Sequence, residues 1–266
     1  MAAVEKWAIE GLNGPNIFRG QADEDWKLSP SLTRSLNERG YSPQTALIAE
    51  NRILKEFQGR YKDIDAYCKA LRTTDLLSWW EIMQHHSVPT RLLDWTKSPQ
   101  VALHFAVSSL PEKNGALFIM DAGHLQWIQS TRARDPEEKP NWSAFEELNK
   151  SVNGDSYEKS MVVISSPTPT TRMSSQHSSF TISTEILESH DITGDGIVFG
   201  KCINLSGSDP SIFSKFVIPS YLKKMFAEKL MEEGFYSKSL FPDSRIMDEN
   251  IESCLREIYT ILDGRV

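Results

Sequence analysis

The densest group of side chains that could do chemistry lies in residues 80–96, where polar residues stand between tryptophans and leucines. Burying such polar side chains costs free energy unless they pair with one another or bind a ligand. We therefore interpret this segment as part of a binding or catalytic site. Its candidate residues are Glu81, Gln84, His85, Thr90, Arg91, Asp94 and Thr96.

A second group is Arg19-Gly20-Gln21, which follows the apolar residues Ile17 and Phe18. A guanidinium can hold a phosphate or a carboxylate by paired, charge-assisted hydrogen bonds. Gly20 leaves room for a close approach to the backbone. The structural alternative for Arg19 is an ion pair near the edge of a sheet. We favour the anion-binding interpretation.

Several residues of the first group have a structural alternative that the sequence leaves open. Arg91 and Asp94 stand three positions apart, so they can pair with each other and fix a loop. Gln84 and His85 stand at the expected end of a helix, where a histidine often pairs with a carbonyl or carboxylate group. Ser98 precedes Pro99, and this pair is typical of a helix N-terminus, which explains Ser98 without a ligand.

The elements that must position these residues indicate an α+β fold, because helices and short strands do not alternate strictly. We expect one compact domain over residues 1–266, with its core at about 10–250 and a small mixed sheet flanked by helices. Polar excursions are expected at about 130–160 and 183–201. Apolar periodicity predicts helices at 44–61, 76–86, from 98 onward, 221–233 and 248–262. Strands are predicted at 17–21, 115–120, 161–164, 180–182 and 216–218.

Composition narrows the classes of function. The net charge of −7 and the absence of a Lys/Arg run argue against generic binding of duplex DNA. The three cysteines are far apart and form no CxxC pair, so we expect neither a disulfide framework nor a cysteine-rich zinc site. No signal peptide or long apolar stretch is visible, and we expect a cytoplasmic protein with no membrane partner.

Three motifs taken together resemble the FRG domain, a family named for its Phe-Arg-Gly sequence. They are Phe18-Arg19-Gly20-Gln21, Gln84-His85 and Pro89-Thr90-Arg91-Leu92-Leu93-Asp94-Trp95-Thr96. Segments similar to later parts of the family extend the resemblance to about residues 10–250; they lie at 26–34, 102–106, 172–181, 218–219 and 234–243.

The chain departs from the family pattern at Ser87 and Ser178, where glycine is usual. Glycine enters left-handed backbone conformations freely and serine does not. These two positions therefore predict altered backbone geometry, with a greater effect on activity than on fold.

A more remote resemblance is to ADP-ribosyltransferases, which use NAD as a substrate. Arg19, the stretch Thr96-Lys97-Ser98 before a helix, and Gln176 occur in a similar order. The resemblance implies that Arg19 binds the diphosphate and that Thr96 and Ser98 shape the ribose site. Gln176, together with Glu81 or Asp94, would then stabilise a cationic sugar. No metal is required.

The first functional expectation is therefore an NAD-utilising ADP-ribosyltransferase or NAD glycohydrolase, with a protein, nucleic acid or water as acceptor. A toxin or defence role follows only by analogy. The alternative is a non-catalytic module that binds a nucleotide or a phosphorylated ligand through Arg19 and Arg91. A third reading, a nuclease or RNA-processing protein, is disfavoured by the acidic charge and the missing metal motif.

Overall fold

The computed structural model describes residues 16–61, 76–123, 144–155, 161–165, 178–190, 213–240 and 249–264 of the 266-residue chain. Its strands are β1 (Asn16–Gln21), β2 (Leu93–Thr96), β3 (Gly115–Asp121), β4 (Met161–Ser165), β5 (Ser178–Ser183) and β6 (Phe213–Ile218). Its helices are α2 (Ser31–Glu38), α3 (Pro43–Tyr61), α5 (Leu76–His85), α6 (Pro99–Val107), α8 (Ala144–Asn153), α10 (Ser220–Glu232), α11 (Ser237–Leu240) and α12 (Glu249–Leu262). The fold is α+β, as the sequence predicts.

The strands form one sheet in the order β4-β5-β2-β1-β3-β6, and each neighbouring pair is antiparallel. The expectation of a mixed sheet was wrong in this respect. The chain leaves β1 and enters β2 at the same end of the sheet, so the intervening helices need not cross it, and antiparallel pairing results. None of the helices in the described ranges is both long enough and apolar enough to cross a bilayer.

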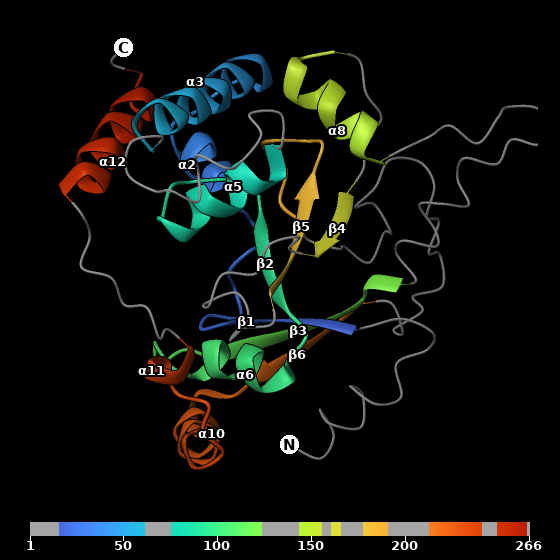
Figure 1. Ribbon diagram of the computed structural model, residues 1–266. Coiled ribbons are helices and arrows are strands. Elements are labelled where there is room, and N and C mark those ends of the chain that lie inside the picture. The colour runs from blue at the N-terminus through green and yellow to red at the C-terminus, as the bar shows by residue number, and fades with distance from the viewer. Residues whose placement is uncertain are drawn as a thin grey trace, which may run out of the picture.

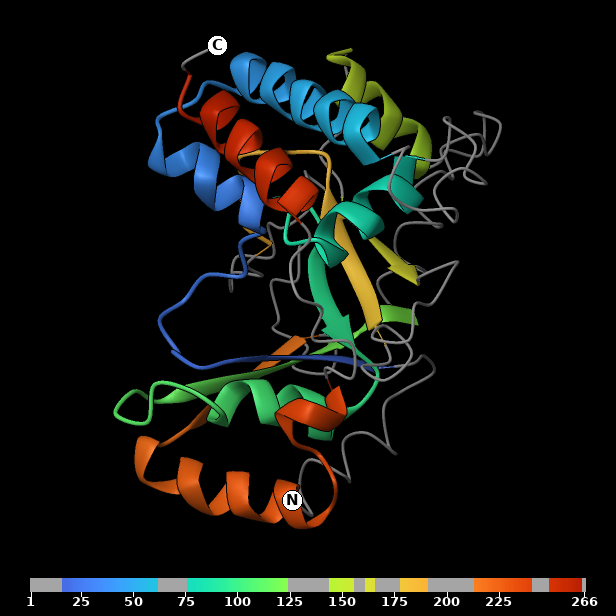
Figure 2. The ribbon, with the colours of Figure 1, turned by 60° about the vertical axis from the view of Figure 1, so that its left-hand side comes forward.

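The sheet is weakly joined at its centre. Strands β1 and β2 share one register pair, Phe18 opposite Thr96, whereas β1 pairs with β3 along its whole length. In Figure 1 the half containing β2, β4 and β5 runs at a steep angle to the half containing β1, β3 and β6, and Figure 2 shows the same divergence from a second side. A space between the two halves therefore opens next to the single described register pair of β1 with β2.

The helices cover the two halves separately. Helix α6 packs on β1 and β3, and α10 packs on the outside of α6. Helices α2, α3, α5, α8 and α12 gather beyond the other half, near β2, β4 and β5 (Figure 1). The buried side chains follow this division only in part. One apolar cluster lies within the helical group and includes Phe180 and Ile182 of β5, and another lies where α6 and α10 pack on the sheet. The third joins the two halves, because it contains Phe118 of β3 and Met161 of β4.

Most predicted elements are confirmed, with small shifts at their ends. In α3 the predicted apolar stripe is buried, from Ala46 to Phe57. In α6 the Ser98 hydroxyl accepts a hydrogen bond from the backbone N–H of Val101 at 3.3 Å, as expected of an N-cap. Strand β3 is buried on both faces, which agrees with its continuous apolar sequence.

Some elements differ from the prediction or were not predicted, and β2 (Leu93–Thr96) is one of the latter. The expected polar excursion at 130–160 contains α8, which buries Leu148 and Val152 in the helical cluster. These two residues stand four apart, a spacing that a helix turns into one apolar face even when the residues around them are polar. Helix α2 was not predicted, although Leu32 and Leu36 have the same spacing and are also buried.

Candidate functional site

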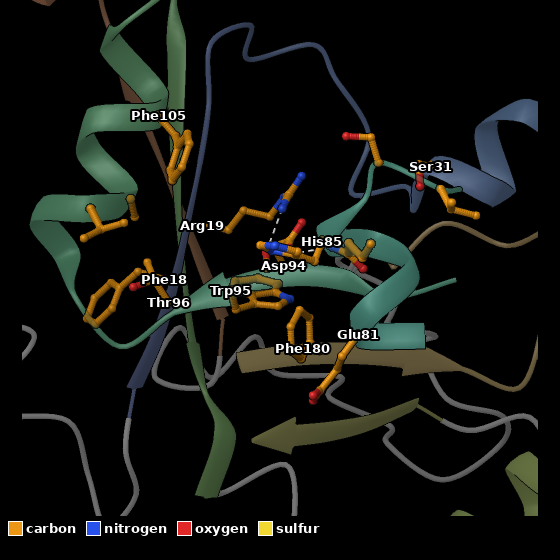
Figure 3. A pocket seen from close by; sticks show the side chains of 16 residues that line it. Phe18, Arg19, Ser31, Glu81, His85, Asp94, Trp95, Thr96, Phe105 and Phe180 are labelled. Atoms are coloured by element: carbon orange, nitrogen blue, oxygen red, sulfur yellow. Dashed lines mark hydrogen bonds between the residues drawn. The ribbon is translucent and has the colours of Figure 1, made fainter. Parts of the chain in front are cut away.

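A cavity of about 380 Å³ lies where β1 and β2 diverge. Strands β1 and β2, the C-terminal part of α5, the first turns of α2 and α6, and β5 all contribute to its wall (Figure 3). Its volume falls within the range of small-molecule sites. The lining residues are Phe18, Arg19, Gly20, Ser31, Glu81, Gln84, His85, Ser87, Val88, Asp94, Trp95, Thr96, Val101, Ala102, Phe105 and Phe180.

Arg19 supplies the positive charge of this cavity. It follows Phe18, the last residue of β1 that pairs with β2. Its Nη1 donates a hydrogen bond to the backbone carbonyl oxygen of Asp94 at 2.7 Å. The arginine side chain thus crosses the gap where the two strands have separated, and Figure 3 shows it projecting into the cavity.

The electrostatic surroundings of Arg19 are unusual for an arginine. Burial lowers its pKa from the ordinary value, the Asp94 carboxylate acts in the opposite direction, and the Arg34 guanidinium lowers it further. The Nε atom is buried and donates to no acceptor within the described ranges. A buried guanidinium N–H without an acceptor is costly, so a bound anion would stabilise this arrangement.

Gly20 is constrained by helix α6. A β-carbon at this position would lie 1.7 Å from the carbonyl oxygen of Ala102. The close backbone approach that the sequence led us to expect therefore exists, but α6 makes it. Gly20 also lines the cavity. Because glycine has no side chain, α6 can pack directly against β1, and Arg19 and the start of α6 lie on the same wall of the cavity.

The polar residues of α5 and β2 form a short hydrogen-bonded chain. The hydroxyl of Thr90 donates to Gln84 Oε1 at 2.9 Å, and Gln84 Nε2 donates to Asp94 Oδ1 at 2.5 Å. Gln84 and Asp94 line the cavity, whereas Thr90 is buried behind Gln84. Thr90 thus fixes the orientation of the Gln84 amide, and Gln84 fixes the Asp94 carboxylate.

Helix α5 brings two further candidates to the cavity wall. Glu81 is buried, and in Figure 3 its carboxylate points away from Arg19, past Phe180. His85 is partly buried, and its ring packs edge-on against that of His86 with centroids 5.1 Å apart. Thr96 lies at the far end of β2, where its hydroxyl accepts from the backbone N–H of Ser98 at 3.1 Å.

Arg91 is placed elsewhere. Its guanidinium forms a two-pronged ion pair with Glu50 of α3, with Nε to Oε1 at 2.7 Å, and both side chains are almost fully buried. It also lies over the Trp80 ring, 5.6 Å from the centroid. Among the described residues, the cavity lining does not include Arg91. Neither its expected pairing with Asp94 nor a shared pocket with Arg19 is found.

Gln21 and Ser98 stand outside the cavity wall. Gln21 is buried, and its amide donates to the carbonyl oxygen of Lys27 at 3.2 Å. Ser98 caps α6, which is the structural role that the sequence left open. Gln176 lies outside the described residues, so its part in the site stays a prediction.

The two serines at usual glycine positions differ from each other. Ser87 has φ of 63°, in the left-handed region, so the residue that lines the cavity there adopts a conformation that favours glycine. Ser178 lies in β5 opposite Thr96, where the extended backbone suits any residue. The expected backbone strain therefore applies to Ser87 alone.

The aromatic part of the wall was not predicted as a site. Three strands and a helix contribute its side chains, which are Phe18, Trp95, Phe105 and Phe180. The sequence could indicate that these residues are buried or that they belong to a motif, but not that they meet at one cavity. Trp95 is fixed from behind, because its Nε1 donates to Thr181 Oγ1 at 2.9 Å. The same hydroxyl lies 2.9 Å from Nδ1 of the buried His190.

Burial, together with the positive charges of Arg19 and Arg91, lowers the pKa of His190 to about 3. The imidazole is therefore neutral at physiological pH, and its Nδ1 can accept the hydroxyl proton of Thr181 while that hydroxyl accepts from Trp95. The wall of the cavity is thus supported by a neutral hydrogen-bonded chain.

Comparison with known proteins supports the family suggested by the motifs. The model of the FRG domain matches residues 14–115, which include β1, α5, β2 and α6 and hence most of the cavity wall. No curated protein and no solved structure matches the chain. The cavity is therefore built largely from the matched segment, and over residues 14–115 this chain is an FRG domain.

Proposed function

We propose that this chain is an ADP-ribosyltransferase-like enzyme that binds NAD in the cavity between β1 and β2. The observation that carries the proposal is the convergence of a partly buried guanidinium, a hydroxyl and carboxylates on one cavity. Arg19, Thr96 and Asp94 all line it, and they come from adjacent strands. They correspond to the residues that the remote resemblance singles out.

Arg19 is the anchor for the diphosphate of NAD. Its Nη1 is occupied by the Asp94 carbonyl, while the buried Nε has no acceptor among the described residues. A phosphate oxygen would satisfy that donor and offset the cost of burying the charge. The rings of Phe105 and Trp95 supply apolar surface for the planar groups of the dinucleotide.

The proposed reaction breaks the glycosidic bond between the ribose C1′ and the nicotinamide nitrogen. The electron pair of that bond leaves with nicotinamide, which loses its positive charge. The acceptor then forms a bond to C1′ and releases a proton. Asp94 is the carboxylate best placed to stabilise the cationic sugar, since it is exposed in the cavity beside Arg19, whereas Glu81 points away from Arg19 (Figure 3).

The test is incubation with NAD labelled in nicotinamide and in adenine, with release of the first label and transfer of the second both followed. We expect turnover by the wild type, loss of turnover and of NAD binding in Arg19→Ala, and loss of turnover with retained binding in Asp94→Asn. Arg256→Ala is the matched control, because Arg256 lies on the exposed side of α12 and pairs with Glu252. Turnover that persists in Arg19→Ala would contradict the assignment.

A second candidate, a module that binds a nucleotide without turning it over, is favoured by one observation. The Asp94 carboxylate is already held by the Gln84 amide, which is in turn held by Thr90. A carboxylate held in this way is suited to shaping a binding site. Calorimetric binding of NAD by the wild type without any release of nicotinamide would support this second function over the first.

A further inference from the structure

The end of the cavity opposite Arg19 is formed by the first turn of α2. Ser31 is the first residue of that helix and lines the cavity. In Figure 3 Ser31 lies across the cavity from Arg19. No side chain caps this helix terminus, and the backbone N–H of Leu32 in its first turn donates to the carbonyl oxygen of Thr90 at 3.1 Å.

Arg34 stands one turn after Ser31 and therefore on the same side of α2. Its Nη1 donates to the carbonyl oxygen of Ser29, which holds the guanidinium beside the start of the helix. The rest of the side chain is exposed. Within the described ranges no carboxylate forms an ion pair with Arg34.

Arg34 is also close enough to Arg19 for the two charges to interact. The Arg34 guanidinium is one of the causes that lower the pKa of Arg19. Two cations held near each other repel, and an anion between them removes that repulsion. One phosphate group can be held by Arg19 alone, whereas a diphosphate is long enough to contact a second cation at the cavity mouth.

We propose that Arg34, beside the start of α2, forms a second anion subsite at the cavity mouth, and that Arg19 and Arg34 together select ligands that carry a diphosphate group. The inference rests on the proposed function, because it assigns the ligand to the same cavity. The inference adds Arg34, a residue outside the cavity lining, to the binding site. It predicts that the protein binds a nucleoside diphosphate more tightly than the monophosphate of the same nucleoside.

The test is calorimetric titration of the full chain with ADP, AMP and inorganic pyrophosphate. The titrations compare three proteins, which are the wild type, Arg34→Gln and Arg256→Gln. Arg256 is the matched control, being an exposed arginine that pairs with Glu252 on α12. We expect the wild type to prefer ADP over AMP, and Arg34→Gln to lose about tenfold in affinity for ADP with little change for AMP, as the loss of one charged hydrogen-bonding partner predicts.

The outcomes are distinguishable. Equal loss of ADP and AMP affinity in Arg34→Gln, or no loss of either, would overturn the clamp while leaving the nucleotide site in place. Binding of pyrophosphate that weakens in Arg34→Gln, without binding of ADP or AMP, would support the clamp and overturn the proposed function. Binding of none of the three probes by the folded wild type would overturn both. Unchanged thermal unfolding of Arg34→Gln checks that the variant is folded.

Discussion

The backbone of Gly20 lies directly against Ala102 of α6, so close that a β-carbon at Gly20 would stand 1.7 Å from the Ala102 carbonyl oxygen. The clash is with backbone, which no side-chain rotation relieves. This contact joins the strand that carries Arg19 to helix α6, whose first turns line the cavity beside it.

The first prediction follows from that contact. Gly20→Ala forces β1 and α6 apart, and we expect it to lower the free energy of unfolding by about 1–3 kcal/mol, the range for overpacking. It should also weaken ligand binding, because Arg19 moves with β1. Equilibrium unfolding in urea measures the first effect. Gly59→Ala is the control, since it lies in α3 with nothing within 4 Å of its added carbon; it should stabilise by about 0.5–1 kcal/mol.

The second prediction concerns Ser87. Its left-handed φ of 63° costs a residue other than glycine about 1–2 kcal/mol of folding free energy. Replacement by glycine also makes the unfolded chain more flexible, which lowers the stability of the folded state by about 0.4–1 kcal/mol. Ser87→Gly should therefore raise the free energy of unfolding by up to about 1.6 kcal/mol. Ser178→Gly, in a strand, should lower it. Destabilisation by both substitutions would show that Ser87 makes compensating contacts.

The third prediction separates structure from function at Arg91. Arg91→Met leaves Glu50 buried without its partner, and we expect a loss of about 3–5 kcal/mol in the free energy of unfolding. Replacing both residues by methionine should recover much of that loss, because no buried charge then remains. Unfolding in guanidinium chloride gives both values. Full stability of Arg91→Met together with lost nucleotide binding would instead make Arg91 a ligand-binding residue.

The fourth prediction is a pH dependence from His190. Its pKa is about 3 in the folded state and about 6.5 when unfolded, so the unfolded chain binds the proton more readily between those values. Stability is therefore present above pH 6.5 and is lost as the pH falls towards 3, by about 1.4 kcal/mol per unit.

The variant His190→Gln isolates this contribution. Between pH 7 and pH 5 the wild type should lose about 2 kcal/mol more than His190→Gln, as its 1.5 units below the unfolded pKa imply. Urea unfolding of both proteins at the two pH values measures the difference. Equal losses would mean that His190 takes up no proton on unfolding in this range.

The sequence predicted those elements whose apolar spacing is regular. The stripe from Ala46 to Phe57 is the buried face of α3, and the run from Gly115 to Met120 is the buried strand β3. Helix α8 was not predicted because its buried apolar residues, Leu148 and Val152, stand among polar residues that hide the helical spacing. The motifs likewise indicated the FRG domain, since residue types at fixed positions are readable without any structure.

The sequence by itself determined which residues are candidates for chemistry, and Arg19, Gln84, His85, Asp94 and Thr96 all line the cavity. Only the tertiary structure decided that Arg91 pairs with Glu50, which is distant in the sequence, and that Arg19 lines the cavity. An arginine has the same chemistry in both places. Its role depends on which acceptors the fold brings within hydrogen-bonding distance, and those acceptors come from distant segments that local spacing does not specify.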